Sequence, residues 1–105
     1  MKNQTKLKAP DRIAQILDAA LVVASKVGYA RLTREDIAKR ADVPASLISY
    51  HMGTMPALRR KIMREAIRTE CLPVVAQGLA IRDRFALKAP AELQDRAIQS
   101  LRGTA

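Results

Sequence analysis

The chain has 105 residues, of which 49% are hydrophobic and only 3% aromatic, and 19 basic against 10 acidic side chains give a formal charge of +9. This length predicts one domain with an aliphatic core, and the lack of β-branched runs favours helix over sheet. The positive charge favours a polyanionic partner such as nucleic acid, because Lys and Arg near phosphates release bound counterions.

The first ten residues are polar and basic, and we interpret residues 1–10 as a flexible arm. Lys6 and Lys8 in this arm are candidate contacts to a minor groove or to a nucleic-acid backbone. A helical period begins at Asp11 and ends at Gly28, which is a good carboxyl-side stop. Its apolar stripe follows steps of three and four along Ile13, Ile16, Leu17, Ala20, Leu21, Ala24 and Val27.

Two short helices joined by a tight turn follow this first helix. Thr33 with Asp36 three residues later resembles a capping box at the start of the second helix. Asp42 and Val43 form the predicted turn, and Pro44 fits the first turn of a third helix that ends before Gly53. The sequence therefore predicts a helix–turn–helix DNA-binding domain over residues 11–54.

In a helix–turn–helix protein the second helix of the motif enters the major groove of DNA. Ala45 and Leu47 can touch thymine methyl groups, Ser46 and Ser49 can bond to base edges, and Tyr50 and His51 suit phosphate oxygens. The amino end of the preceding helix favours phosphate. The candidate DNA contacts are Thr33, Arg34, Pro44, Ala45, Ser46, Leu47, Ser49, Tyr50, His51, Lys6 and Lys8.

Each of these residue types also has a purely structural interpretation. Leu47 can belong to the core, Tyr50 can cover the side of the bundle, and His51 can be a packed or capping histidine. Thr33 can be an ordinary amino cap, and a charged tail is usually only solvated. The candidate residues taken together are stronger evidence for DNA binding than any one of them alone.

Residues 55–105 are predicted to form a short helical dimerisation region. One helix should start near Met55 or Pro56 and reach about Glu70, a second should run from Pro73 to about Leu87, and a last one from Pro90 to about Arg102. The first of these has two apolar stripes, which indicates more than one neighbour. The predicted dimer interface comprises Met63, Ile67, Val75, Leu79 and Phe85.

Catalysis, metal binding and membrane insertion find no support in the sequence. His51 and Cys71 are the only residues of their types, no phosphate-loop or metal-ligand spacing occurs, and no apolar run reaches the length of a membrane span. No leader-like segment is recognised, and a single thiol suits a reducing compartment. We expect a soluble, cytoplasmic protein that is not an enzyme and needs no cofactor or metal.

Several motifs between Ile13 and Leu58 carry a resemblance to the TetR family of transcriptional regulators. They are ILDAA at 16–20, VGY at 27–29, LTREDIAKRA at 32–41 and VPASLISYHMG at 43–53. The resemblance implies an all-α fold, a three-helix DNA-binding head, a homodimer and an operator with two half-sites. The chain departs from the family pattern at Asp42, where Gly is usual, at Met52, where Phe is usual, and at Met55, where a phosphate-binding Lys is common.

The sequence ends about fifty residues after Leu58, whereas family members usually add a large ligand-binding domain. We therefore expect a dimeric repressor without a dedicated inducer pocket, controlled by its concentration or by a protein antagonist, of a kind that a phage or plasmid uses. Two alternatives remain open. One is a ligand-responsive regulator with a small or inter-subunit pocket, and the other is a protein-interaction module that keeps the helix–turn–helix shape.

Overall fold

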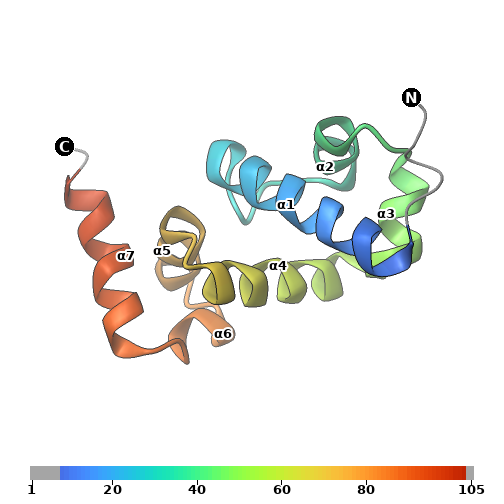
Figure 1. The fold of residues 1–105 in the computed structure, drawn as a ribbon. Coiled ribbons are helices and arrows are strands. Elements are labelled where there is room, and N and C mark those ends of the chain that lie inside the picture. Colours follow the sequence, from blue (N-terminus) through green and yellow to red (C-terminus); the bar gives the residue numbers. More distant parts are fainter. Residues whose placement is uncertain (1–7, 104–105) are drawn as a thin grey trace.

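A computed structural model describes residues 8–103, and every regular element in this range is a helix (Figure 1). The predicted all-α fold is therefore confirmed. Along the chain the helices are α1 Ala9–Val27, α2 Arg34–Ala41, α3 Ala45–Met52, α4 Met55–Thr69, α5 Leu72–Ala80, α6 Arg84–Leu87 and α7 Ala91–Gly103. Helices α1 and α4 lie along the molecule, with α3 near one end and α7 near the other (Figure 1).

Helix α1 is the central support of the fold. It begins at Ala9, two residues before the predicted start, because Pro10 is compatible with the first turn of a helix, where no amide donor is needed. Ile16, Ala20 and Ala24 are fully buried on one side. The helix ends at Gly28, whose φ of 114° is a conformation that residues with a Cβ atom rarely adopt.

One continuous core joins the first three helices to the last four. Fully buried aliphatic side chains come from both parts: Ile16, Ile37, Ile48, Met52, Leu58, Ile62, Met63, Val74, Val75 and Ala97. The dimer interface predicted from sequence needs correction at Met63 and Val75, which are 0% exposed and so belong to the core of their own chain. Ile67, Leu79 and Phe85 are partly exposed but also pack against this core.

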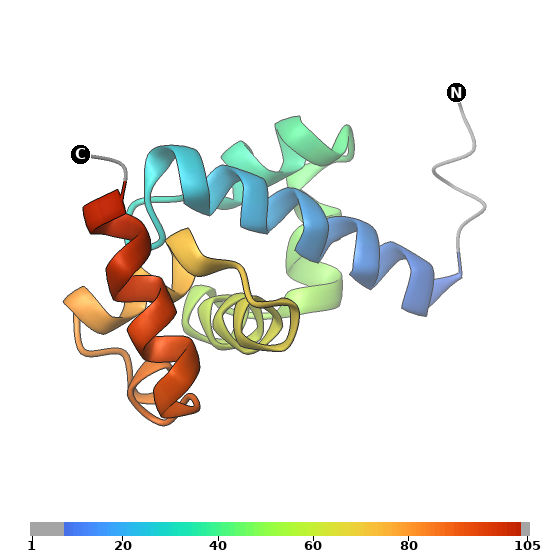
Figure 2. The ribbon, with the colours of Figure 1, turned by 60° about the vertical axis from the view of Figure 1, so that its left-hand side comes forward.

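The single helix predicted over residues 73–87 is wrong. Helix α5 ends at Ala80, and Arg82 takes a left-handed conformation with a φ of 59°. The Asp83 carboxylate then accepts hydrogen bonds from the amides of Phe85 and Ala86, at 2.9 and 3.0 Å, and so caps α6. The predicted break at residues 88–90 is present, and α7 lies against α5 (Figure 2).

Gly78 allows α5 to approach its neighbours closely. A Cβ atom at this position would lie 2.4 Å from the Met63 methyl carbon of α4 and 2.9 Å from the Ala86 Cβ of α6. Both distances are shorter than a carbon–carbon contact can be. The glycine that interrupts the apolar pattern of α5 is therefore a packing requirement.

Two side chains fasten the carboxyl-terminal helices to the end of α1. The Gln77 side chain of α5 donates to the Ala24 carbonyl at 3.0 Å and accepts from the Tyr29 amide. The buried Tyr29 hydroxyl lies 2.9 Å from the Arg59 carbonyl and 3.0 Å from an Asp83 carboxylate oxygen. These bonds satisfy polar groups that would otherwise be buried without partners.

Burial, and then the hydrogen bond to Asp83, raise the pKa of Tyr29 above its usual range. A folded-state pKa above the unfolded value of about 10 stabilises the fold below pH 10 and loses that contribution as the pH rises further. We expect Tyr29→Phe to lower the free energy of unfolding at neutral pH by about 1–2 kcal/mol. The difference between the two proteins should shrink in urea titrations above pH 10. A constant difference between pH 7 and pH 11 would contradict this.

Candidate nucleic-acid interface

The amino end of α2 is closed by a reciprocal pair of hydrogen bonds. The Thr33 hydroxyl accepts from the Asp36 amide at 3.1 Å, and the Asp36 carboxylate accepts from the Thr33 amide at 3.0 Å. The predicted capping box is therefore present, with Asp in place of the more common Glu. Thr33 thus has a structural role that leaves its exposed side compatible with a phosphate contact.

The turn between α2 and α3 depends on Asp42. This residue has φ 61° and ψ 48°, the left-handed conformation that the sequence predicts for it. Aspartate tolerates this region better than most residues with a Cβ atom. Pro44 directly precedes α3 as its N-cap, with φ −67° and ψ 147°, one position earlier than predicted. The turn therefore forms with Asp42 in the left-handed conformation and without a glycine.

Helix α3 presents a clear division between a buried and an exposed side. Ile48 and Met52 are 0% exposed and attach the helix to the core. Ser46, Ser49 and Tyr50, which we call the reading face, are exposed, and Tyr50 is 82% exposed. A large aromatic side chain so far from any core contact is available to a partner molecule.

The other α3 candidates are less accessible than the reading face. Ala45, Leu47 and His51 are partly buried, and Ala45 packs against the core. The His51 ring makes an edge contact with the Tyr50 ring, at 5.0 Å between centroids and 83° between planes. The predicted set therefore includes every residue of α3 except the buried Ile48 and Met52, and only the reading face is fully exposed.

Two side chains from outside α3 hold its carboxyl end in position, and a third fastens the end of α2. The Lys61 ammonium of α4 donates to the Met52 carbonyl at 3.1 Å, and the Arg34 guanidinium of α2 donates to the Gly53 carbonyl at 3.3 Å. The Gln15 side chain of α1 donates to the Ala41 carbonyl at 3.0 Å and ties the end of α2 to α1. Preorganised support of this kind fixes the angle at which a recognition helix is presented.

These contacts modify one expectation from the sequence and add a residue that was not predicted. Arg34, predicted as a phosphate contact, also braces the carboxyl end of α3. Lys61 was missed, because its pairing with a carbonyl nine residues earlier depends on the path of the chain between α3 and α4. Lys8 is exposed directly before α1, whereas Lys6 lies outside the described residues.

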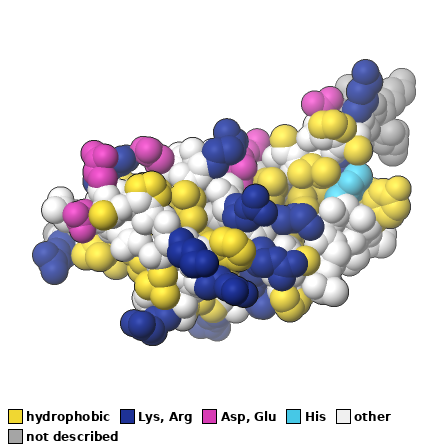
Figure 3. All heavy atoms as spheres, turned by 90° about the horizontal axis from the view of Figure 1, so that it is seen from below, with side chains coloured by type: hydrophobic (Ala, Val, Ile, Leu, Met, Phe, Trp, Pro, Cys, Tyr) yellow, Lys and Arg dark blue, Asp and Glu magenta, His cyan; other side chains and the backbone are white. Residues whose placement is uncertain are grey.

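Positive charge gathers along α4 as well as near α3. Arg59, Arg60, Lys61, Arg64 and Arg68 lie within ten residues, with Glu65 as the only acid among them. Basic side chains with apolar ones between them cover the face of the molecule that carries α4 (Figure 3). The concentration of basic residues in the stretch 59–68 is visible in the sequence, but these residues were not among the predicted contacts.

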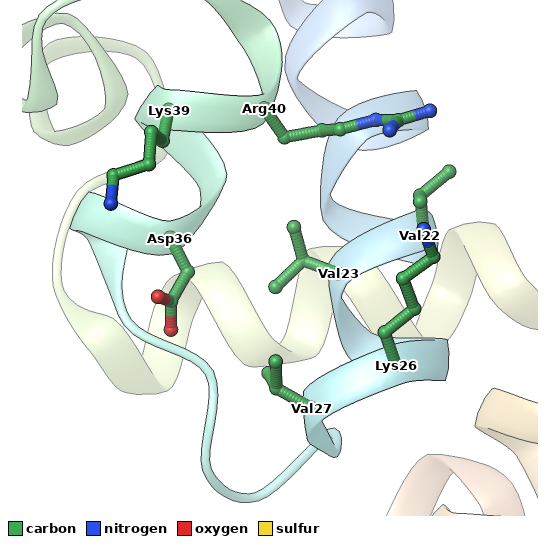
Figure 4. Close-up of a pocket in the computed structure, with 7 residues that line it drawn as sticks. All are labelled: Val22, Val23, Lys26, Val27, Asp36, Lys39 and Arg40. Atoms are coloured by element: carbon green, nitrogen blue, oxygen red, sulfur yellow. The ribbon is translucent and has the colours of Figure 1, made fainter.

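A groove of about 300 Å³ lies between α1 and α2 (Figure 4). Val23 and Val27 of α1 point toward the space that Asp36 of α2 also faces, and the Arg40 side chain extends toward α1. The Asp36 carboxylate is already bonded to the Thr33 amide. The volume is at the lower end of the range for small-molecule sites, and its polar groups do not converge on a common point.

Residues 8–103 contain neither a membrane-spanning helix nor a cluster of metal-ligating side chains. No helix there combines the length and apolarity needed to cross a membrane. Within the same range, no group of three or more His, Cys, Asp or Glu side chains is placed to hold a metal ion.

Helix α3 has an exposed face, is held by side chains of α2 and α4, and follows a tight turn after the capped helix α2. This arrangement is that of a helix–turn–helix DNA-binding protein. Residues 16–62, somewhat under half of the chain, match a family model described as "Bacterial regulatory proteins, tetR family". This segment is therefore a helix–turn–helix domain of the TetR type, which supports a DNA-binding transcription regulator. No curated protein and no solved structure matches it.

Proposed function

We propose that this regulator acts as a homodimer that occupies a pseudopalindromic operator and represses transcription from the promoter it covers. The proposal rests chiefly on the reading face, where Ser46, Ser49 and Tyr50 project from a helix whose opposite side is fully buried. Two such helices in a dimer would lie about one turn of DNA, roughly 34 Å, apart. The chain then performs no catalysis and acts in the cytoplasm, where DNA is available.

The three-dimensional distribution of charge supports this assignment. Arg34 and Lys61 place positive charge at the carboxyl end of α3, and further basic residues follow along α4. Phosphate contacts of this kind position a protein on the duplex, and base contacts then give specificity. Lys61 also places a cation near the end of α3, although Met55 occupies the position of the family's usual Lys.

Selection of bound duplexes from a random DNA pool tests this proposal. We expect enrichment of an inverted repeat with half-sites about one helical turn apart, and a binding constant that falls steeply with salt concentration. A selection that enriches no sequence would contradict the proposal. So would binding that does not respond to salt, which would favour a protein-interaction module instead.

The dimer surface that we propose lies on the outer side of α7. Leu93 and Ala97 attach this helix to the rest of the chain, whereas Ile98 is 41% exposed and Leu101 is 58% exposed. Apolar side chains one helical turn apart form the type of stripe that pairs with a second helix. This surface lies near the end of the molecule away from α3, so a dimer formed there leaves both reading faces accessible (Figure 1).

We expect Ile98→Asp to weaken self-association at least about tenfold, because it places a charge in an apolar contact. Sedimentation velocity over a concentration series measures this, and operator affinity should fall in parallel. Ile81→Asp is the matched control, since Ile81 is 53% exposed in the turn between α5 and α6. If both variants sediment like the wild type, the dimer surface lies elsewhere.

We also propose that the regulator has no dedicated inducer pocket. Grooves on the described surface have volumes of about 230, 240, 300 and 440 Å³. Drug-sized ligands usually occupy cavities of about 300–1,000 Å³ that enclose most of their surface. Two of these volumes reach that range, but both features are open surface grooves that would not enclose a ligand. Control by protein concentration or by a protein antagonist therefore fits the surface better than control by a small molecule.

A further inference from the structure

The largest of these grooves runs between α1 and α4. Its volume is about 440 Å³, and its lining consists of Ile13 and Leu17 of α1 with Lys61, Arg64, Glu65 and Arg68 of α4. We call it the α1–α4 groove. Both helices start at the α3 end of the molecule, so the groove begins beside the DNA-binding surface (Figure 1).

The groove has an apolar side and a basic side. Ile13 and Leu17 are four residues apart, so they lie one above the other on the same face of α1. Both are partly exposed, although they pack against the core. Across from them, Lys61, Arg64 and Arg68 follow helical steps of three and four along α4. Apolar and basic side chains therefore run in parallel along the groove.

The charges in the groove are only partly neutralised within the chain. Arg68 pairs with Glu65 at 2.6 Å, and its side chain is 71% exposed whereas that of Glu65 is 17% exposed. Arg64 has no ion-pair or hydrogen-bond partner among residues 8–103. The Lys61 ammonium has one carbonyl partner and no carboxylate partner in this range. A ligand with carboxylates would meet cations that the fold leaves available.

The geometry points to an amphipathic acidic helix of a partner protein as the occupant of the α1–α4 groove. Such a helix can place apolar residues on Ile13 and Leu17 and carboxylates on Lys61, Arg64 and Arg68, which is the helix-in-groove mode of recognition. A DNA backbone would satisfy the cations but would leave the apolar side without a matching surface. A second copy of this chain would bring like charges together, since the same three cations would face one another.

The proposal deepens the proposed function, because an acidic protein seated there would lie beside the recognition helix. It would compete for the region of positive charge that DNA also uses. The groove therefore supplies a physical basis for control by a protein antagonist. Binding of the acidic helix itself does not require DNA, so the two proposals are tested separately.

The experiment measures binding of a synthetic peptide by fluorescence anisotropy in the absence of DNA. The probe is an amphipathic helix of roughly 15 residues, with Leu on one face and Glu on the other, long enough to hold helical structure. A scrambled peptide of the same composition is the reference. We expect the amphipathic peptide to bind the full chain at least about tenfold more tightly than the scrambled one, because only the ordered pattern matches both sides of the groove.

Substitutions on the two sides of the groove separate the charge contribution from the apolar one. Arg64→Glu should weaken peptide binding about tenfold, and the matched control Arg102→Glu, an exposed site on α7, should leave it unchanged. Leu17→Gln should weaken it about fivefold. The matched control Ile81→Gln should have no effect, and circular dichroism checks that each variant is folded.

Two results would overturn the proposal. One is equal binding of the amphipathic and scrambled peptides with no effect of Leu17→Gln, which would identify a general polyanion surface suited to DNA phosphates. The other is no detectable binding of either peptide at low salt. If operator binding fails but the peptide binds as expected, the acidic-helix site stands and the proposed function does not.

Discussion

Tyr50→Ala should reduce operator affinity about ten- to a hundredfold while the melting temperature stays within a degree or two of the wild type. The side chain is 82% exposed, so its removal opens no cavity in the core. A hydrogen bond from its hydroxyl to a charged phosphate is worth about 1.5–3 kcal/mol, which gives the expected loss. Anisotropy titrations with the selected operator and thermal melts measure both quantities.

Tyr50→Phe separates the contribution of the Tyr50 hydroxyl from that of its ring. It removes the hydroxyl and keeps the ring that contacts His51 at 5.0 Å. If the hydroxyl binds phosphate, Phe should lose most of the affinity that Ala loses. Should the melting temperature of Tyr50→Ala fall together with affinity, Tyr50 is structural and its assignment to the reading face is wrong.

Gly78→Val should lower the free energy of unfolding by about 3 kcal/mol or more, since overpacking a filled core is costly. The Cβ atom would lie 2.9 Å from the Ala86 Cβ, which is fixed to its backbone, and 2.4 Å from the Met63 methyl carbon. Met63 has a flexible side chain but is 0% exposed, so any movement away from the new side chain has to be accommodated inside the core. For a chain of this size, the melting temperature should fall by roughly 12–24 °C.

Ala80→Val is the matched control for this substitution, because Ala80 is exposed on the same helix. It should change the melting temperature by only a few degrees. Shortening the neighbour in the double variant Gly78→Val with Met63→Ala should recover part of the stability, as expected for side chains in contact. Equal stability of Gly78→Val and Ala80→Val would contradict the close packing of α4, α5 and α6.

The head could be predicted from sequence because its signals are local. Each signal depends on residues only a few positions apart. The signals are the capping pair Thr33 and Asp36, the turn residue Asp42 and the apolar period of the first helix. The structure confirms them within one or two residues. Ile48 and Met52 of α3 are four residues apart, and the helical period places both on the buried side.

The carboxyl-terminal half was predicted less well, for a physical reason. An apolar residue on a helix shows that something covers it, but not whether the cover belongs to the same chain. Met63 and Val75 were therefore assigned to a partner, although both lie in the monomer core. The turn at Arg82 was missed because it depends on a left-handed residue that has no glycine signal.

The hydrogen bonds of Gln77 bear on any attempt to move this DNA-reading module into another regulator. The support for the end of α1 and for the Tyr29 amide comes from α5, well beyond the segment that matches the family. A graft cut just after α4 would lack this amide side chain and would expose the aliphatic side of α4. A transplantable unit has to extend through α5, and in chimeric regulators the specificity for DNA and the scaffold must be exchanged together.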